Sequence, residues 1–143
     1  MECELPTINE NKDEIKKIFE EVKVIAVPGL SPDESKPSHR VAKYLKEQGY
    51  KIVPIYPKED EILGEKVYRS VEEIPFKVDM IDMFRKAPVA KQMLEVMKKR
   101  GDIKVLWLQE GIVNNEVGEE AKKLGYKFVQ SRCTMVEHRG LFS

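Results

Sequence analysis

The sequence has no long apolar run and no excess of either charge. No stretch approaches the roughly 20 apolar residues of a membrane-spanning helix, and residues 1–14 lack the basic head and apolar block of a signal peptide. Lys plus Arg and Asp plus Glu each total 25, so no overall field attracts nucleic acid or an anionic membrane. We therefore expect a cytoplasmic protein that has neither partner and that holds any anion by local groups.

Cysteine is also scarce. Cys3 and Cys133 lie far apart and outside C-x-x-C spacing, so the sequence predicts neither a disulfide framework nor a zinc site, and we expect no metal. Charged residues make up 35% of the chain in balanced signs, with few Asn and Gln, as on the ion-pair-rich surfaces of thermophilic proteins. No internal repeat or Gly/Ser-rich linker divides the 143 residues, which predict a single domain over 1–143.

Short apolar segments alternate with amphipathic segments along the chain. Runs rich in β-branched and aromatic residues predict buried strands at 22–27, 51–56, 78–84, 104–109 and 127–130. Apolar residues at three-to-four spacing predict helices at 9–21, 38–49, 87–101 and 114–125, and a short strand and turn are expected within 64–76. This alternation predicts an α/β fold, a Rossmann-like doubly wound parallel sheet in a three-layer α/β/α arrangement.

Ligands of such folds bind beyond the carboxyl ends of the strands, so we expect the site within 28–40, 56–60, 84–88 and 109–115. In the first segment Gly29 lets the backbone approach a ligand closely, and a helix beginning near Ser38 offers free N–H groups to an anion. Further donors in this loop are Ser31, Ser35, Lys36, His39 and Arg40. The loop predicts a phosphate or pyrophosphate site; the alternative is that Ser38 caps the helix and the charged side chains are solvated.

The glycine pattern restricts which nucleotide would bind. An NAD-type site needs G-x-G-x-x-G and an acidic residue after the second strand, whereas Gly29 lacks the following glycines and that strand ends in Tyr-Pro-Lys. The G-x-x-x-x-G-K-[ST] motif of P-loop proteins is absent as well. Lys58 at the tip of the second strand favours an additional phosphate on the ribose, which NADP or coenzyme A carries.

Four segments, 28–58, 78–90, 105–116 and 132–138, resemble the single-domain CoA-binding protein family, which is related to the CoA-binding domain of succinyl-CoA synthetase. The resemblance covers about residues 20–139, and the charge-rich composition fits an archaeal hyperthermophile member. Pro28 before the glycine and Lys36 before Pro-Ser depart from the family pattern, but neither removes a donor.

The resemblance implies a bound coenzyme A or acyl-CoA that contacts three groups of residues. The pyrophosphate would be held by Gly29, Ser31, Lys36, Pro37, Ser38, His39 and Arg40. The adenosine with its 3′-phosphate would lie between Pro57 and Lys58 on one side and Phe84, Arg85 and Pro88 on the other. The pantetheine side would be lined or supported by Trp107, Gln109 and Gly111.

The same residues allow other roles. Arg85 follows a buried strand and is costly to bury unpaired, so we expect a phosphate or a carboxylate partner for it. Phe84 ends that strand and could belong to the core. Trp107 stands in an unbroken apolar strand, where core or interface packing is the favoured expectation.

Cys133, Glu137 and His138 could share one face of a helical turn and activate a thiolate. The favoured alternative is a structural C-terminal turn, because ion-pair clusters are common without chemistry. We therefore expect no catalytic residue, and binding without turnover by this chain alone. If the turn folds back to the strand ends, the thiol of CoA would reach Cys133 and form a mixed disulfide under oxidation.

Two other functions stay open at this point. An acyl-CoA-using enzyme that acts with a partner subunit would share the CoA site, but the sequence lacks the phosphohistidine loop and second domain of a synthetase. An NADP-binding oxidoreductase is favoured by the fold and Lys58 and disfavoured by the glycine pattern. The sequence leaves open the acyl group, a partner protein and a homo-oligomer.

Overall fold

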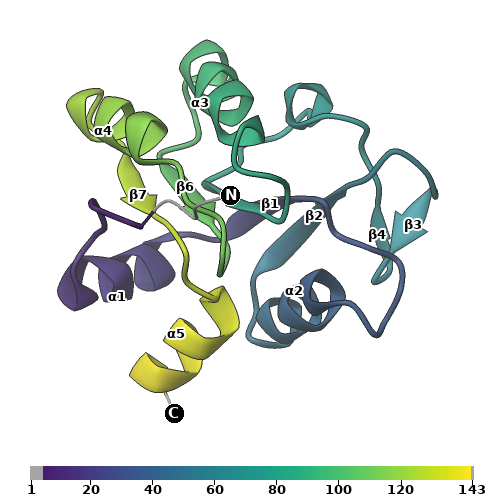
Figure 1. The fold of residues 1–143 in the computed structure, drawn as a ribbon. Coiled ribbons are helices and arrows are strands. Elements are labelled where there is room, and N and C mark those ends of the chain that lie inside the picture. Colours follow the sequence, from purple (N-terminus) through teal and green to yellow (C-terminus); the bar gives the residue numbers. More distant parts are fainter. Residues whose placement is uncertain (1–4, 143) are drawn as a thin grey trace.

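Five parallel strands form one sheet in the computed structural model, which describes residues 5–142 (Figure 1). Cys3 lies outside these residues. The strands are β1 (Val24–Pro28), β2 (Lys51–Ile55), β5 (Met80–Met83), β6 (Val105–Leu108) and β7 (Lys127–Val129), and their spatial order is β2-β1-β5-β6-β7. The expected Rossmann-like parallel sheet is confirmed, with every expected strand within two residues of its predicted bounds.

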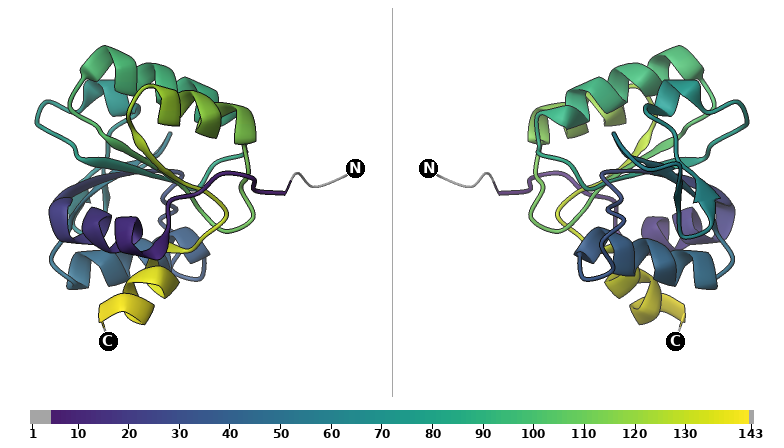
Figure 2. Two further views of the ribbon diagram at one scale, coloured as in Figure 1. Left: turned by 90° about the vertical axis from the view of Figure 1, so that its left-hand side faces the viewer. Right: turned by 90° about the vertical axis from the view of Figure 1, so that its right-hand side faces the viewer.

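Helices cover both faces of the sheet and complete the three layers. The helices α3 (Val89–Arg100) and α4 (Asn115–Lys123) lie on one face, and α1 (Lys12–Glu21), α2 (Pro37–Glu47) and α5 (Thr134–Phe142) lie on the other (Figure 2). The connection from β2 to β5 contains the hairpin of β3 (Glu61–Ile62) and β4 (Glu65–Lys66) and the 3-10 turn η1 (Val71–Glu73). Within residues 5–142, no helix has the length and apolar character needed to cross a membrane.

Side-chain caps explain where two helices begin, and a glycine explains where a third one ends. The side chain of Asn11 accepts a hydrogen bond from the Glu14 amide at the start of α1, and Asn114 accepts one from the Val117 amide at the start of α4. Helix α3 ends at Gly101, whose φ of 78° is the left-handed conformation favoured for glycine. These local signals are why the predicted helix bounds agree with the structure to within a few residues.

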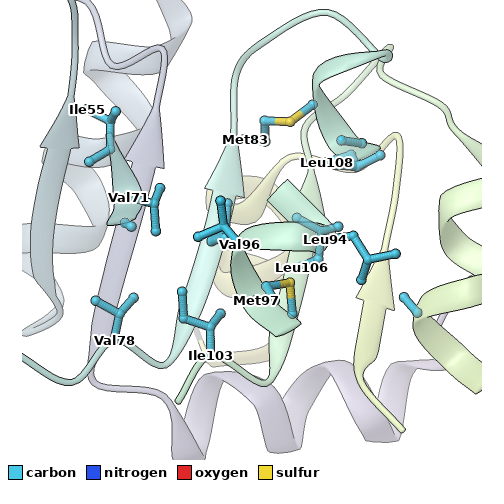
Figure 3. Close-up of a cluster of buried hydrophobic side chains, with 14 of the residues drawn as sticks. Ile55, Val71, Val78, Met83, Leu94, Val96, Met97, Ile103, Leu106 and Leu108 are labelled. Atoms are coloured by element: carbon cyan, nitrogen blue, oxygen red, sulfur yellow. The ribbon is translucent and has the colours of Figure 1, made fainter. Parts of the chain in front are cut away.

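Two apolar clusters hold the layers together. On the face covered by α3 and α4, Leu94 and Met97 pack with Val78, Met83 and Leu106 (Figure 3). These side chains are at most 1% exposed, and removing such surface from water supplies most of the stabilisation of the fold.

On the opposite face Trp107 is fully buried, and its ring centroid lies 5.4 Å from that of Phe19. The indole Nε1 donates to the Arg132 carbonyl oxygen at 2.8 Å, so the one polar atom of the side chain is satisfied inside the protein. The favoured expectation for Trp107, a core residue, agrees with this position. The same bond ties the segment before α5 to the sheet.

Helix α5 is the element that the sequence analysis missed, because it treated 132–138 as a turn. The helix is short and contains Gly140, so its intrinsic propensity is weak. Tertiary contacts supply its stability: a hydrogen bond of 2.8 Å joins the Tyr44 hydroxyl to His138 Nδ1, and the rings of Phe19 and His138 meet edge to face at 5.2 Å. Burial lowers the pKa of His138, which favours the neutral ring in this aromatic environment.

The strand order places the reversal of the chain between β1 and β5. After β1 the chain winds through α2 to β2 on one side, and it later returns to β5 on the other side of β1. The connections therefore leave the carboxyl ends of these two neighbouring strands in opposite directions and open a crevice between them, which is where ligands of such folds bind. Gly29 follows β1 at this crevice, and Phe84 follows β5.

Candidate functional site

Gly29 and Phe84 meet at the crevice between β1 and β5. The Phe84 amide donates to the Pro28 carbonyl oxygen at 2.9 Å, and Gly29 has a φ of 85°. A Cβ added to Gly29 would lie 2.4 Å from the Phe84 carbonyl oxygen. The absence of a Cβ at Gly29 therefore makes room for the backbone that follows the neighbouring strand. The expected approach of a ligand to this glycine stays a prediction.

We predict that Gly29→Ala lowers the free energy of unfolding more than Gly125→Ala does. Gly125 has a nearly equal φ of 86° with no atom within 4 Å of an added Cβ, so it reports left-handed strain alone. The clash at Gly29 should add about 1–3 kcal/mol, typical of overpacking. Urea unfolding of both variants measures the difference, and equal losses would show that the approach of Phe84 is not what demands glycine.

Helix α2 begins at Pro37, one residue earlier than expected, and Lys36 in the capping position makes no side-chain cap. Ser38 is therefore not the cap; its Oγ accepts from the Ser31 amide at 3.0 Å, and the side chain is 6% exposed. The backbone N–H of Ser38 donates to no group within residues 5–142. It points along the positive end of the helix dipole and is free for an anion.

Two expected anion donors instead hold the loop between β1 and α2. His39 is 7% exposed, and its Nδ1 donates to the Ser31 carbonyl oxygen at 2.9 Å. The Arg40 guanidinium donates to the Ser35 carbonyl oxygen. The Ser35 hydroxyl and amide both donate to Asp33, which lowers the pKa of that carboxyl. The loop is thus ordered by its own bonds before any ligand arrives.

A cavity of about 450 Å³ opens between the ends of β1 and β6 and the start of α2, and we call it the β1–α2 cavity. Its walls contain half of the predicted site residues, namely Gly29, Ser31, Lys36, Pro37, Ser38, Phe84 and Gln109. Cys133, which we expected the thiol of CoA to reach, is also in the wall, and three further wall residues were not predicted as ligand contacts, namely Val41, Glu110 and Ile112. Glu110 and Ile112 do lie within the expected segment 109–115, whereas Val41 belongs to the apolar face of α2, which sequence assigns to packing.

A second cavity of about 420 Å³ lies toward β2, and we call it the β2-side cavity. It is lined by the predicted residues Pro57, Phe84 and Arg85 together with Gly29, Ile55, Tyr56 and Arg69. Because Gly29 and Phe84 line both cavities, the two meet at the reversal of the chain. The remaining predicted residues, His39, Arg40, Lys58, Pro88 and Gly111, line neither of these two cavities.

Arg85 is exposed, which corrects the expectation that its burial demands a partner. Its guanidinium makes no ion pair or hydrogen bond with any other residue of the described chain. The side chain lies beside Gly29, where its Cδ would be 3.1 Å from an added Cβ. Arg85 therefore offers an unneutralised cation at the junction of the two cavities.

Arg69 is a site residue that the sequence analysis did not find. Its Nη1 donates to the carbonyl oxygens of Tyr56, Lys58 and Glu59 at 3.0, 3.0 and 2.8 Å. These bonds fix the loop after β2 that forms one wall of the β2-side cavity. No spacing rule pairs position 69 with that loop, because the contact depends on the parallel bridge between Ile55 and Tyr68.

Asp82 forms a buried polar group with Gln109 and Thr134 beneath the β1–α2 cavity. Gln109 Nε2 donates to Asp82 Oδ1 at 2.5 Å and to Thr134 Oγ1 at 2.8 Å, and Thr134 Oγ1 donates to Asp82 Oδ2 at 3.0 Å. Asp82 is fully buried, and this burial raises its pKa to about 7 although both hydrogen bonds oppose the rise. The sequence signal was present: a lone acidic residue within an apolar strand is costly to bury without donors.

We predict that Asp82→Asn flattens the pH dependence of stability. A folded-state pKa raised to about 7 means that the folded protein binds a proton more readily than the unfolded chain. The contribution of Asp82 to the free energy of unfolding is therefore complete below about pH 4, which is the pKa of Asp in the unfolded chain. It is lost as pH rises through about 7. Urea midpoints from pH 4 to 8 should fall for the wild type across this window, and the Asn variant should lack that fall.

Asp102→Asn is a control of opposite sign for this prediction. The hydrogen bond from the Arg100 guanidinium lowers the pKa of Asp102 to about 2, so its contribution is lost as pH falls below 4. The Asp102 variant should change the urea midpoints below pH 4 and should retain the decrease in midpoint from pH 4 to 7. A wild-type midpoint that does not change between pH 4 and 7 would contradict the assignment to Asp82.

Cys133 lines the β1–α2 cavity, and the acid and imidazole expected near it both have other partners. Glu137 lies 3.9 Å from Arg132 in an ion pair, and His138 is bonded to Tyr44. The absence of a catalytic residue stays a prediction. The half-buried thiol is free, and it faces the same space as the start of α2.

The fold and the paired cavities define a doubly wound α/β domain with a candidate ligand site at its chain reversal. The sequence profile of the CoA binding domain family matches residues 23–139, and the chain belongs to this family. The expected membership of the CoA-binding family is confirmed. Relatives include the alpha subunit of an ADP-forming acetate–CoA ligase from Pyrococcus furiosus.

Relatives of two lengths share this domain. The chain is 37% identical to YneT of Bacillus subtilis over 134 residues, 91% of the chain and 96% of that protein. A Pyrococcus horikoshii protein of known structure is 36% identical over the full length of both chains, with a TM-score of 0.89. The Pyrococcus furiosus ligase subunit is 39% identical over 100 residues, but the chain spans only 21% of that subunit.

Proposed function

We propose that this protein binds coenzyme A, with the ligand lying across both cavities and its pyrophosphate above Gly29. The observation that carries the proposal is the junction of the two cavities, with the free Ser38 N–H in the wall of the β1–α2 cavity and the unpaired Arg85 in the wall of the β2-side cavity. Membership of the CoA binding domain family and the relationship to an acetate–CoA ligase subunit support it.

The shape of the two cavities suits an elongated ligand with an anionic middle. Coenzyme A has an adenosine 3′-phosphate at one end, a pyrophosphate in the middle and a pantetheine arm that ends in a thiol. The Ser38 amide, the dipole of α2 and the cations of Lys36 and Arg85 supply positive charge where the cavities meet. Since the net formal charge of the chain is zero, this local cluster is what would attract the diphosphate.

The walls of the cavities assign the two ends of the ligand. Tyr56 and Pro57 offer flat apolar surface to an adenine in the β2-side cavity. Val41 and Ile112 offer apolar surface to the pantetheine arm in the β1–α2 cavity, at whose wall Cys133 lies. Lys58 is exposed at the rim of the loop after β2, within the reach of a flexible side chain for the 3′-phosphate.

We predict that Arg85→Gln and Lys58→Gln weaken binding in different ways. Arg85 at the junction should contact the pyrophosphate, so its loss should weaken coenzyme A and dephospho-CoA alike by about 10-fold or more, as expected for a charge-assisted bond. Lys58 should contact only the 3′-phosphate, so its loss should weaken coenzyme A and leave dephospho-CoA unchanged. Isothermal titration calorimetry with both ligands measures the four effects.

Lys86→Gln is the matched control, because Lys86 is exposed beside Arg85 and lines neither cavity. It should retain wild-type affinity for both ligands. Wild-type protein that binds NADP more tightly than coenzyme A, or neither of them, would overturn the proposed function. Equal affinity of wild type for coenzyme A and dephospho-CoA would remove Lys58 from its assigned role.

The position of Cys133 leads to a further prediction about the thiol end of the ligand. In the presence of CoA disulfide, the Cys133 thiolate should attack one sulfur, form a protein–CoA disulfide and release one CoA thiolate, which balances the exchange. The reaction is favoured by the placement of Cys133 in the wall of the β1–α2 cavity, where its thiol is free. Intact mass spectrometry should detect one CoA adduct that a reductant removes.

Variants at both cysteines locate that adduct. It should persist in Cys3→Ser and disappear in Cys133→Ser, and saturation with acetyl-CoA, which has no free thiol, should slow its formation by occupying the cavity. An adduct on Cys3 alone would contradict the placement of the arm beside Cys133. The proposed binding of coenzyme A would survive that result, because calorimetry tests it separately.

A further inference from the structure

Gln109 presents one atom to the β1–α2 cavity. Its side chain is 3% exposed, and Nε2 uses its two N–H groups on Asp82 and Thr134. Its Oε1 accepts no hydrogen bond within the described residues, and no fully buried side-chain oxygen or nitrogen in this part of the chain lacks a partner. Oε1 is therefore accessible, and the β1–α2 cavity is the space that Gln109 lines.

The charge of Asp82 decides which end of this amide faces the cavity. Both carboxylate oxygens accept hydrogen bonds, Oδ1 from Gln109 and Oδ2 from Thr134, so the N–H side of Gln109 must turn toward Asp82. The two ends of an amide have nearly the same shape, and without an ionised acceptor below it the amide could turn over. The NH2 group would then face the cavity in place of the carbonyl oxygen.

We propose that Asp82 is a positioning residue that, through Gln109 and Thr134, makes the floor of the β1–α2 cavity a hydrogen-bond acceptor for an N–H or O–H group of the bound molecule. The inference rests on the proposed binding of coenzyme A and deepens it. The pantetheine arm carries two amide N–H groups, and one of them would donate to Gln109 Oε1. The adenosine and pyrophosphate would not depend on Asp82.

Protonation of Asp82 should reverse the amide. A carboxylic acid carries an O–H that can donate to Gln109 Oε1, and burial places this change near pH 7. The titratable groups on the helices over this face have other partners: His39 donates to the Ser31 carbonyl oxygen, His138 bonds to Tyr44 and Glu137 pairs with Arg132. Lys36, Glu110 and Cys133 also line the cavity. The Cys133→Ser background removes the thiol, and the Asn variant retains Lys36 and Glu110, so a pH effect of those two residues would appear in both proteins.

Affinities for coenzyme A and for adenosine 3′,5′-bisphosphate, which lacks the arm, test the inference by calorimetry in that background. Asp82→Asn places an NH2 group where the carboxylate was and should weaken coenzyme A by about 10-fold at pH 8, the cost of leaving one polar pair unmatched. The bisphosphate should bind both proteins equally. The parent protein should lose affinity for coenzyme A as pH falls from 8 to 6, and the Asn variant should not.

Thr134 provides a second variant in case Asp82→Asn does not fold. Thr134→Val removes the hydroxyl at constant shape and should weaken coenzyme A but not the bisphosphate, whereas Thr134→Ser retains the hydroxyl and should restore affinity. Equal losses for both ligands, or no loss in either the Asp82 or the Thr134 variant, would overturn the inference while leaving CoA binding intact. A parent protein that binds neither ligand would instead overturn the proposed function, and this inference with it.

Discussion

The contact between Gly29 and the Phe84 carbonyl is the constraint on which the site depends. Strands β1 and β5 are neighbours in the sheet, yet the chain leaves them toward opposite sides, so their carboxyl ends would separate unless something joined them. The Phe84 amide bonds to the Pro28 carbonyl oxygen, and the absence of a Cβ at Gly29 lets the Phe84 carbonyl approach. One ridge of backbone results, with a cavity on each side of it. The same contact that closes the core therefore divides the candidate site into two connected compartments.

The segment before helix α5 contributes Cys133 to the wall of the β1–α2 cavity, and polar bonds rather than helix propensity hold α5 in place. The Trp107 indole reaches the Arg132 carbonyl oxygen, Tyr44 bonds to His138, and Thr134 joins the carboxylate of Asp82. A buried carboxylate is costly, and an apolar residue at position 82 would pack against α5 without that penalty. What an apolar residue could not do is orient the amide above it. The free-energy cost of burying Asp82 thus falls at the position where the orientation of the Gln109 amide is set.

The fold was predictable from sequence because each strand and most helices carry their own local pattern. The segments 52–55 and 105–108 are apolar throughout, as strands buried on both faces must be. Asn11 begins α1 and Gly101 ends α3 by local bonding. The loops of the candidate site were located for the same reason, since they follow from the strand ends. Individual side chains were less predictable: His39 turns inward to a carbonyl oxygen, Arg85 is exposed, and Arg69, which follows the β3–β4 hairpin, bonds to the loop after β2. Their directions depend on contacts between segments, which no local pattern encodes.

Most polar groups near the chain reversal are already bonded to the protein. The amides of Gly29 and Ser31 donate to Ile55 and Ser38, and the loop carboxylate of Asp33 is satisfied by Ser35. Among the described residues that line the two cavities, the groups without such a bond include the Ser38 amide, the cations of Lys36 and Arg85, the Glu110 carboxylate and the side-chain oxygen of Gln109. Donors and positive charge in the middle, with an acceptor toward one end, form the complement of a molecule that is anionic at its centre and carries N–H groups on an arm. A phosphate ion alone would contact the donors and cations at the junction and would not reach the acceptor on Gln109. The separation of these groups therefore favours an elongated ligand over a small anion.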